Sequence, residues 1–235
     1  MEGSYCGNNG CGCQAAERSC LHKVPIFSSL NQEEMERIAE IISDREYVRG
    51  ETIYFSGEAR EQLYVINQGK AKVYKVSEAG KEQIIRILYP GDFMGELSLF
   101  VNSPLNSNAE ALEPTAVCVI DGHKLKDIIK EVPGIALKII EELSKRLDNA
   151  ENMIESLGLH DVEQRVADIL LSMSGDQNEI KLTISKKDLA AHMGMSQETL
   201  SRKLTSFQER GWIRQSGQRV IKIIDRPALV NISKG

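Results

Sequence analysis

The stretch LTISKKDLAAHMGMSQETLSRKLTSFQERGWI, residues 182–213, constrains the fold most strongly, because it has the pattern of two helices joined by a tight turn. Ser185 can cap the first helix, and Asp188 lies three residues later as the acid of a capping box. Gly194 supplies the turn, and a second helix is expected from about Ser196 to Gln208. This order of caps and turn predicts a helix-turn-helix, a motif that places its second helix in the major groove of DNA.

The second helix of this motif has a buried and an exposed face. Apolar residues at helical spacing predict the buried stripe, formed by Leu200, Leu204 and Phe207. The expected inward residues of the first helix are Leu189, Ala190 and Met193. The opposite face of the second helix carries the candidates for DNA contact, Gln197, Glu198, Ser201, Arg202 and Thr205.

Two of these candidates suggest how bases are read. Glu198 and Arg202 are four residues apart and share one face of the helix. A carboxylate can accept a hydrogen bond from cytosine N4, while a guanidinium donates to O6 and N7 of guanine. The alternative interpretation is a solvated ion pair between the two side chains, which is common on any helix.

The charge of the chain is unevenly distributed. The net charge is −5, which alone argues against a nucleic-acid partner. However, residues 181–222 hold nine Lys or Arg and three Asp or Glu, a net +6, whereas residues 1–180 carry a net −12. Within the basic part, WIRQSGQRVIKII predicts a two-stranded wing turning at Ser216 and Gly217, with Arg214, Arg219 and Lys222 as candidates for phosphate contacts.

The middle of the chain has the pattern of a β-domain followed by a long helix. From about Gly50 to Ile120, stretches such as IYF, LYVI, AKVYKV, IIRIL and VCVI alternate with turn residues, which predicts an antiparallel sandwich or barrel. The preceding stretch, Asn31 to Ser43, predicts a packing helix. A long helix is expected after Pro133 and Gly134, to about Leu157.

The long helix carries apolar residues at alternating steps of four and three, which we call the seam: Leu143, Leu147, Ala150, Ile154 and Leu157. Charged residues flank the seam, which favours pairing with a second copy of the chain. The alternative is a helix that packs on its own β-domain. Because no acidic residue lies in the seam, we expect the pairing to form without a metal.

Five cysteines form the second notable feature. Cys6, Cys11, Cys13 and Cys20 follow the spacing C-x4-C-x-C-x6-C, and Cys118 lies in AVCVI. No signal peptide or membrane-spanning stretch is apparent, so the chain is expected in the cytoplasm, where metal binding or redox sensing is favoured over structural disulfides. The open alternatives are a zinc site, a dithiol–disulfide switch and, for Cys118, a small buried apolar residue.

These residues resemble the CRP/FNR superfamily of bacterial regulators, and within it the FNR-like oxygen-responsive branch. PGDFMGELSLF, residues 90–100, resembles the sensor-domain hallmark, and MSQETLSRKLTSFQERGWI resembles the recognition helix and its exit. Glu198, Ser201 and Arg202 match the Glu-x-x-Ser-Arg pattern of that branch, which implies a palindrome with TTGAT-like half-sites. Gln197 departs from the Arg found in the cAMP-responsive branch.

The resemblance implies an α+β fold with four parts. A cysteine-rich segment at residues 1–22 precedes an antiparallel β-roll sensor domain at 23–130, which is cupin-like and similar to cyclic-nucleotide-binding domains. A dimerisation helix at 131–158 follows, and a winged helix-turn-helix at 159–235 completes the chain. The implied partners are double-stranded DNA, a second copy of the chain and RNA polymerase, with no membrane.

The resemblance also implies a cofactor. FNR-type sensors hold an oxygen-labile 4Fe–4S cluster through N-terminal cysteines and one cysteine of the sensor domain, and thiolates suit iron. Cys118 matches the distant ligand, and Cys20 is expected to join it, although the N-terminal spacing departs from the usual pattern. Which two of Cys6, Cys11 and Cys13 complete the four ligands stays open, and zinc is the alternative metal. A cluster there would tie the N-terminal segment across the sensor domain and bias the long helix.

Cyclic AMP and enzymatic activity are not expected. Cyclic-nucleotide members carry an Arg-Ser pair that binds the phosphate, whereas LNSNAEAL, residues 105–112, has no Arg, and Ser107 cannot neutralise a phosphate. Glu96 remains from the hallmark and could serve the fold. A metal-binding protein without a DNA function would not explain the basic helix-turn-helix. An iron–sulfur enzyme lacks a catalytic constellation, because the four histidines are dispersed: His22, His123, His160 and His192.

Overall fold

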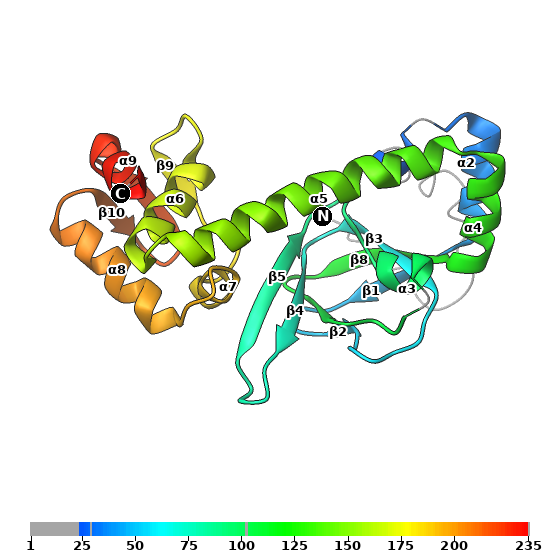
Figure 1. The fold of residues 1–235 in the computed structure, drawn as a ribbon, viewed down its shortest axis with the longest axis horizontal. Coiled ribbons are helices and arrows are strands. Elements are labelled where there is room, and N and C mark those ends of the chain that lie inside the picture. Colours follow the sequence, from blue (N-terminus) through cyan, green and yellow to red (C-terminus); the bar gives the residue numbers. More distant parts are fainter. Residues whose placement is uncertain (1–23, 29, 102, 235) are drawn as a thin grey trace, which may run out of the picture.

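The computed structural model describes residues 24–28, 30–101 and 103–234. Figure 1 shows a β-roll and a smaller C-terminal body joined by the long helix α5, Gly134–Leu159, which crosses the roll and extends beyond it. The α+β fold predicted from the sequence is confirmed. No helix in the described ranges is long and apolar enough to cross a membrane.

The roll consists of two antiparallel four-stranded sheets. Their orders are β1-β8-β3-β6 and β2-β7-β4-β5. The eight strands are β1 Ile42–Tyr47, β2 Thr52–Tyr54, β3 Gln62–Gln68, β4 Ala71–Val76, β5 Glu82–Leu88, β6 Phe93–Met94, β7 Asn108–Ala111 and β8 Thr115–Asp121. The sequence predicted β2, β3, β4, β5 and β8 but not the other three. Strand β7 was missed because its buried residues are the small Ala109 and Ala111, which give no apolar run.

The predicted helix from Asn31 to Ser43 is too long. Asn31 does cap a helix through a capping box with Glu34, but this helix, α2, spans Gln32–Ala39. Ile42 and Ser43 begin β1, where Ile42 pairs with Ile120 of β8. The helical spacing of the isoleucines was therefore overridden by a strand pairing between distant parts of the chain.

Strand β8 separates two cores because successive side chains point to opposite faces. Val117 and Val119 face the interior of the roll, whereas Cys118 and Ile120 face a layer of helices. That layer contains the short helix η1, Pro25–Phe27, together with α2, α4 (Gly122–Glu131) and the start of α5. Cys118 thus lies between the sheet and the helices.

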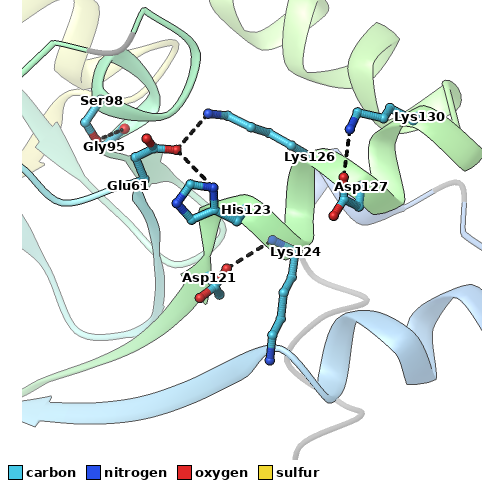
Figure 2. Close-up of polar contacts among 9 residues, drawn as sticks. All are labelled: Glu61, Gly95, Ser98, Asp121, His123, Lys124, Lys126, Asp127 and Lys130. Atoms are coloured by element: carbon cyan, nitrogen blue, oxygen red, sulfur yellow. Dashed lines mark hydrogen bonds and ion pairs between the residues drawn. The ribbon is translucent and has the colours of Figure 1, made fainter.

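Polar contacts fix the junction where β8 runs into α4 (Figure 2). Asp121 caps α4 by accepting a hydrogen bond from the Lys124 backbone N–H at 3.0 Å. Glu61, just before β3, accepts from Nζ of Lys126 at 2.8 Å. A Cβ at Gly122 would lie 2.5 Å from the Glu61 carbonyl oxygen, so the close approach requires glycine. The strand that carries Cys118 is therefore anchored at its end.

The long helix predicted after Pro133 is confirmed, and its seam is largely uncovered. We call the core between the sheet and the layer of helices, which includes Cys118 and Ile120, the helix-layer core. Leu143 packs partly against it, but Leu147 and Ile154 are 61% and 70% exposed in the single chain. Ile140, seven residues before Leu147, is also exposed. The alternative, a seam packed on the chain's own roll, therefore applies only to Leu143.

The C-terminal body contains the predicted helix-turn-helix and wing. Its helices are α6 Val162–Ser174, α7 Lys186–His192, α8 Gln197–Glu209 and α9 Arg226–Lys234. The wing strands β10, Ile213–Ser216, and β11, Val220–Ile223, are joined by β9, Glu179–Lys181, in one antiparallel sheet. The third strand, β9, was not predicted, since a three-residue strand has too little pattern to recognise.

Candidate DNA-binding surface and sensor site

Local sequence signals position the recognition helix α8. Ser196 caps it by accepting a hydrogen bond from the Thr199 backbone N–H at 3.1 Å. Gly194 forms the turn with a φ of 69°, a left-handed conformation that favours glycine. The predicted stripe is buried, with Phe207 fully enclosed. Ser185 caps α7 by accepting from the Asp188 backbone N–H at 3.1 Å, but the Asp188 carboxylate accepts from the Ser185 hydroxyl instead of the backbone N–H, so the cap is confirmed and the predicted capping box is not formed.

The candidate reading face of α8 is accessible. Gln197, Glu198, Arg202 and Thr205 are exposed, and Ser201 is half-buried. Glu198 and Arg202 form no ion pair within the described part of the chain, so the alternative interpretation of this pair is not supported. Both charged groups are thus available to meet a partner outside the chain.

The wing presents two of the three predicted phosphate contacts. Arg214 and Arg219 are exposed, and Gly217 forms the turn with a φ of 64°. Lys222 instead lies 3.1 Å from Oε2 of Glu179 on β9. Part of the positive charge counted in the sequence is therefore neutralised within the sheet.

A second internal ion pair holds α8 against α6, and sequence reasoning missed it. Glu163 of α6 accepts hydrogen bonds from Nζ of Lys203 at 2.7 Å and Nη1 of Arg210 at 2.6 Å. The hydrogen bond from Lys203, followed by that from Arg210, lowers the pKa of Glu163 below its ordinary value. Two more basic residues of this module therefore serve its packing.

The predicted metal ligands are only partly described. Cys118 is 3% exposed in the helix-layer core, together with Val24, Ile26 and Phe27. The other candidates lie outside the described residues: Cys6, Cys11, Cys13 and Cys20. Within the described ranges, no group of three or more His, Cys, Asp or Glu could hold a metal.

A cavity of about 380 Å³ lies between the roll and α5, beside the hallmark segment. Glu96 of α3, Glu96–Phe100, accepts hydrogen bonds from Nη2 of Arg86 and Nη1 of Arg146, each at 3.1 Å. Nη2 of Arg146 also donates to the Phe93 carbonyl oxygen at 2.9 Å. The guanidinium carbon of Arg146 lies 3.8 Å from the centroid of the Phe93 ring. The sequence identified Glu96 but not the two arginines, which come from β5 and α5.

The described histidines have separate surroundings. Nδ1 of His160 lies 2.8 Å from Asp168, and His123 is an exposed neighbour of Glu61. Burial lowers the pKa of His192 below its ordinary value. His22 lies outside the described residues. The three described histidines therefore have different neighbours and do not share one site.

Comparisons with known proteins agree with this architecture. A model of the cyclic nucleotide-binding domain matches residues 44–132, and one of the Crp-like helix-turn-helix domain matches residues 164–232. The "CRP-like cAMP-activated global transcriptional regulator" of Mycobacterium tuberculosis is 28% identical, covering 86% of this chain and 93% of that protein. The "Anaerobic regulatory protein" of Pasteurella multocida is 29% identical, covering 94% and 84%.

A solved structure shows the same arrangement. FixK2 from Bradyrhizobium japonicum has a TM-score of 0.70 and 27% identity, covering 82% of this chain and 97% of FixK2. The two family models together match more than half of this chain, in the order of the roll and the helix-turn-helix. The chain therefore belongs to the CRP/FNR superfamily of DNA-binding transcription regulators.

Proposed function

We propose that this regulator binds a TTGAT-like palindrome as a dimer and responds to oxygen or redox state through a cysteine-held iron–sulfur cluster. The observation that carries the proposal is the position of Cys118. Its side chain lies in the same core as Val24, Ile26 and Phe27, the residues that follow the N-terminal cysteines. One ligand from the roll and several from the N-terminus could therefore share a metal centre.

The spacing along the chain supports this arrangement. Val24 comes four residues after Cys20, and four residues of extended chain span at most about 14 Å. Cys20 thus has the helix-layer core within reach. The match to the anaerobic regulator covers 94% of the chain, which leaves about 14 residues outside it, so it includes Cys20 as well as Cys118.

The donor set fits an iron–sulfur cluster. We propose Cys118, Cys20 and two of Cys6, Cys11 and Cys13 as its ligands. Bound there, the cluster would supply a centre that oxygen can alter, and thiolates are the ligands that iron–sulfur clusters use. The same thiolates also suit zinc, so the metal content has to be measured.

The helix layer offers a route from this centre to the dimer. Helix η1 packs against α5, and Ile135 and Ile139 of α5 share the core with Cys118. A change in how the N-terminal segment is held would therefore act on the first turns of α5. That helix continues to the helix-turn-helix (Figure 1), so its position bears on where α8 lies.

Pairing of two copies along α5 accounts for its exposed apolar residues. Ile140, Leu147 and Ile154 repeat every seven residues, the period of a coiled-coil seam. A second α5 would remove these side chains from water. The pairing would not require the metal, because none of the proposed metal ligands is among these three residues of α5.

The test is anaerobic purification followed by analysis of iron, sulfide and zinc and by absorption spectra before and after air. The proposal predicts iron and sulfide in equal amounts, with absorption that changes on exposure to air. Cys6, Cys11 and Cys13 should each be replaced by serine in a separate variant. Because only two of these three cysteines are proposed as ligands, one of the three variants should keep its full iron content. Zinc without iron would contradict the cluster assignment.

A further inference from the structure

A strand of the roll makes a direct contact with the turn of the helix-turn-helix. Nε2 of Gln83, on β5, donates hydrogen bonds to the carbonyl oxygens of Ala191 at 2.8 Å and His192 at 3.4 Å. These carbonyls lie at the C-terminal end of α7, where few backbone donors are available, and the carbonyl of Ala191 also accepts from the Gly194 backbone N–H at 3.4 Å. Gln83 therefore caps a helix of the other body.

The turn itself is enclosed by three elements. A Cβ built on Gly194 would lie 3.2 Å from Leu157 of α5, 3.5 Å from Oε1 of Gln83 and 3.8 Å from Nη1 of Arg165. The same nitrogen of Arg165, on α6, donates to the Met193 carbonyl oxygen at 2.9 Å. The turn that precedes the recognition helix is thus held from β5, α5 and α6 together.

Apolar contacts extend this interface beyond the hydrogen bonds. Ile87 of β5 and Leu112, just after β7, pack against the core of the C-terminal body. His192, the last residue of α7, is half-buried at this contact. Figure 1 shows the β4–β5 hairpin beside α7. The contact is therefore a packed interface that includes Gln83.

The contact leaves the reading face of α8 open. Gln197, Glu198 and Arg202 are exposed while Gln83 is bound to the end of α7. We propose that Gln83 is a positioning residue, which fixes the helix-turn-helix on the roll and thereby sets the distance between the two recognition helices of a dimer. This inference rests on the proposed binding of a palindrome.

The physical reason is the gain from binding two half-sites at once. Two linked modules bind a double site tightly only when their geometry permits simultaneous contact. A helix-turn-helix released from β5 would keep its own fold and its affinity for one half-site. It would lose the fixed spacing that makes the second contact favourable.

Three variants separate this role from general stability. Gln83→Glu keeps the shape of the side chain but removes both N–H donors facing the carbonyls. Gln83→Lys keeps a donor, and an ammonium group is favourable at a helix C-terminus. Gln68→Glu is the matched control, since Gln68 is an exposed residue of β3 in the same roll.

Binding to two duplexes provides the readout, one with the full TTGAT palindrome and one with a single half-site. We expect Gln83→Glu to weaken binding to the palindrome about tenfold, with the half-site affinity unchanged. Gln83→Lys and Gln68→Glu should stay close to the unsubstituted protein. If Gln83→Glu lost the same affinity for both duplexes, or lost no affinity for the palindrome, the inference would be overturned.

A measurement without DNA distinguishes this inference from the proposed function. Backbone hydrogen exchange in α7 should increase in Gln83→Glu but not in Gln68→Glu. If the unsubstituted protein does not bind the palindrome, the proposed function fails. The contact between Gln83 and the end of α7 is then tested by hydrogen exchange alone. Unchanged exchange in α7 would then refute the contact itself.

Discussion

The ion pair between α6 and the recognition helix allows a quantitative prediction. The side chain of Glu163 is 17% exposed and holds Lys203 and Arg210, whose side chains are 33% and 46% exposed. Because both pairs are partly solvated, each should contribute about 0.5 kcal/mol to the free energy of unfolding. Glu163→Gln should therefore destabilise the C-terminal body by about 1 kcal/mol, or about 4–8 °C in Tm for a body of this size.

The single tryptophan makes this effect measurable. Trp212 lies in the C-terminal body, with the Arg210 guanidinium 4.8 Å from its ring centroid. Urea unfolding followed by Trp212 fluorescence reports on this body directly. Glu209→Gln is the matched control, because it removes the same charge from an exposed residue of α8. A loss of stability no larger than that of the control would refute the reasoning.

The same residue predicts a pH dependence. The hydrogen bonds from Lys203 and Arg210 lower the pKa of Glu163 below its ordinary value of 4.5. The folded state then holds the ionised carboxylate more strongly than the unfolded state. This stabilisation is present above pH 4.5 and is lost as the pH falls through the lower folded value. The difference in the free energy of unfolding between the unsubstituted protein and Glu163→Gln should therefore become smaller in acid. A difference that becomes larger in acid would contradict the lowered pKa of Glu163.

Three further predictions concern DNA, ligand and assembly. Arg202→Ala should weaken binding to the TTGAT palindrome by about 1–3 kcal/mol without changing the unfolding curve, and unchanged binding would refute base reading by α8. Calorimetric titration with cAMP should give no binding heat, because Arg86 and Arg146 are already paired with Glu96, and saturable binding would contradict this. In sedimentation experiments Leu147→Asp should dissociate the dimer, whereas Leu159→Asp, at an exposed position outside the seam, should not. A monomeric unsubstituted protein in air would contradict pairing without the metal.

The parts of the fold that could be predicted are those with local signals. The caps at Ser185 and Ser196, the turn at Gly194 and the apolar stripe of α8 all lie within about 25 residues of one another. The regular strands of the roll and the long helix after Pro133 also have their own periodicity. In each case neighbouring residues carry enough information to specify the structure.

The missed features depend on residues that are distant in the sequence. Strand β1 exists because Ile42 pairs with Ile120, and the bridge at Glu96 joins Arg86 to Arg146. The contact between Gln83 and the end of α7 is of the same kind. An isolated Arg or Gln gives no sign of such a partner, so these features required the structure.

The most direct test of the central claim is DNA binding by one preparation before and after exposure to air. Anaerobically purified protein should bind the TTGAT palindrome, and air should change the affinity together with the loss of the cluster absorption. Cys118→Ala should bind with an affinity that does not depend on air. Equal affinity of the unsubstituted protein in both conditions, with iron present, would contradict regulation through the cluster.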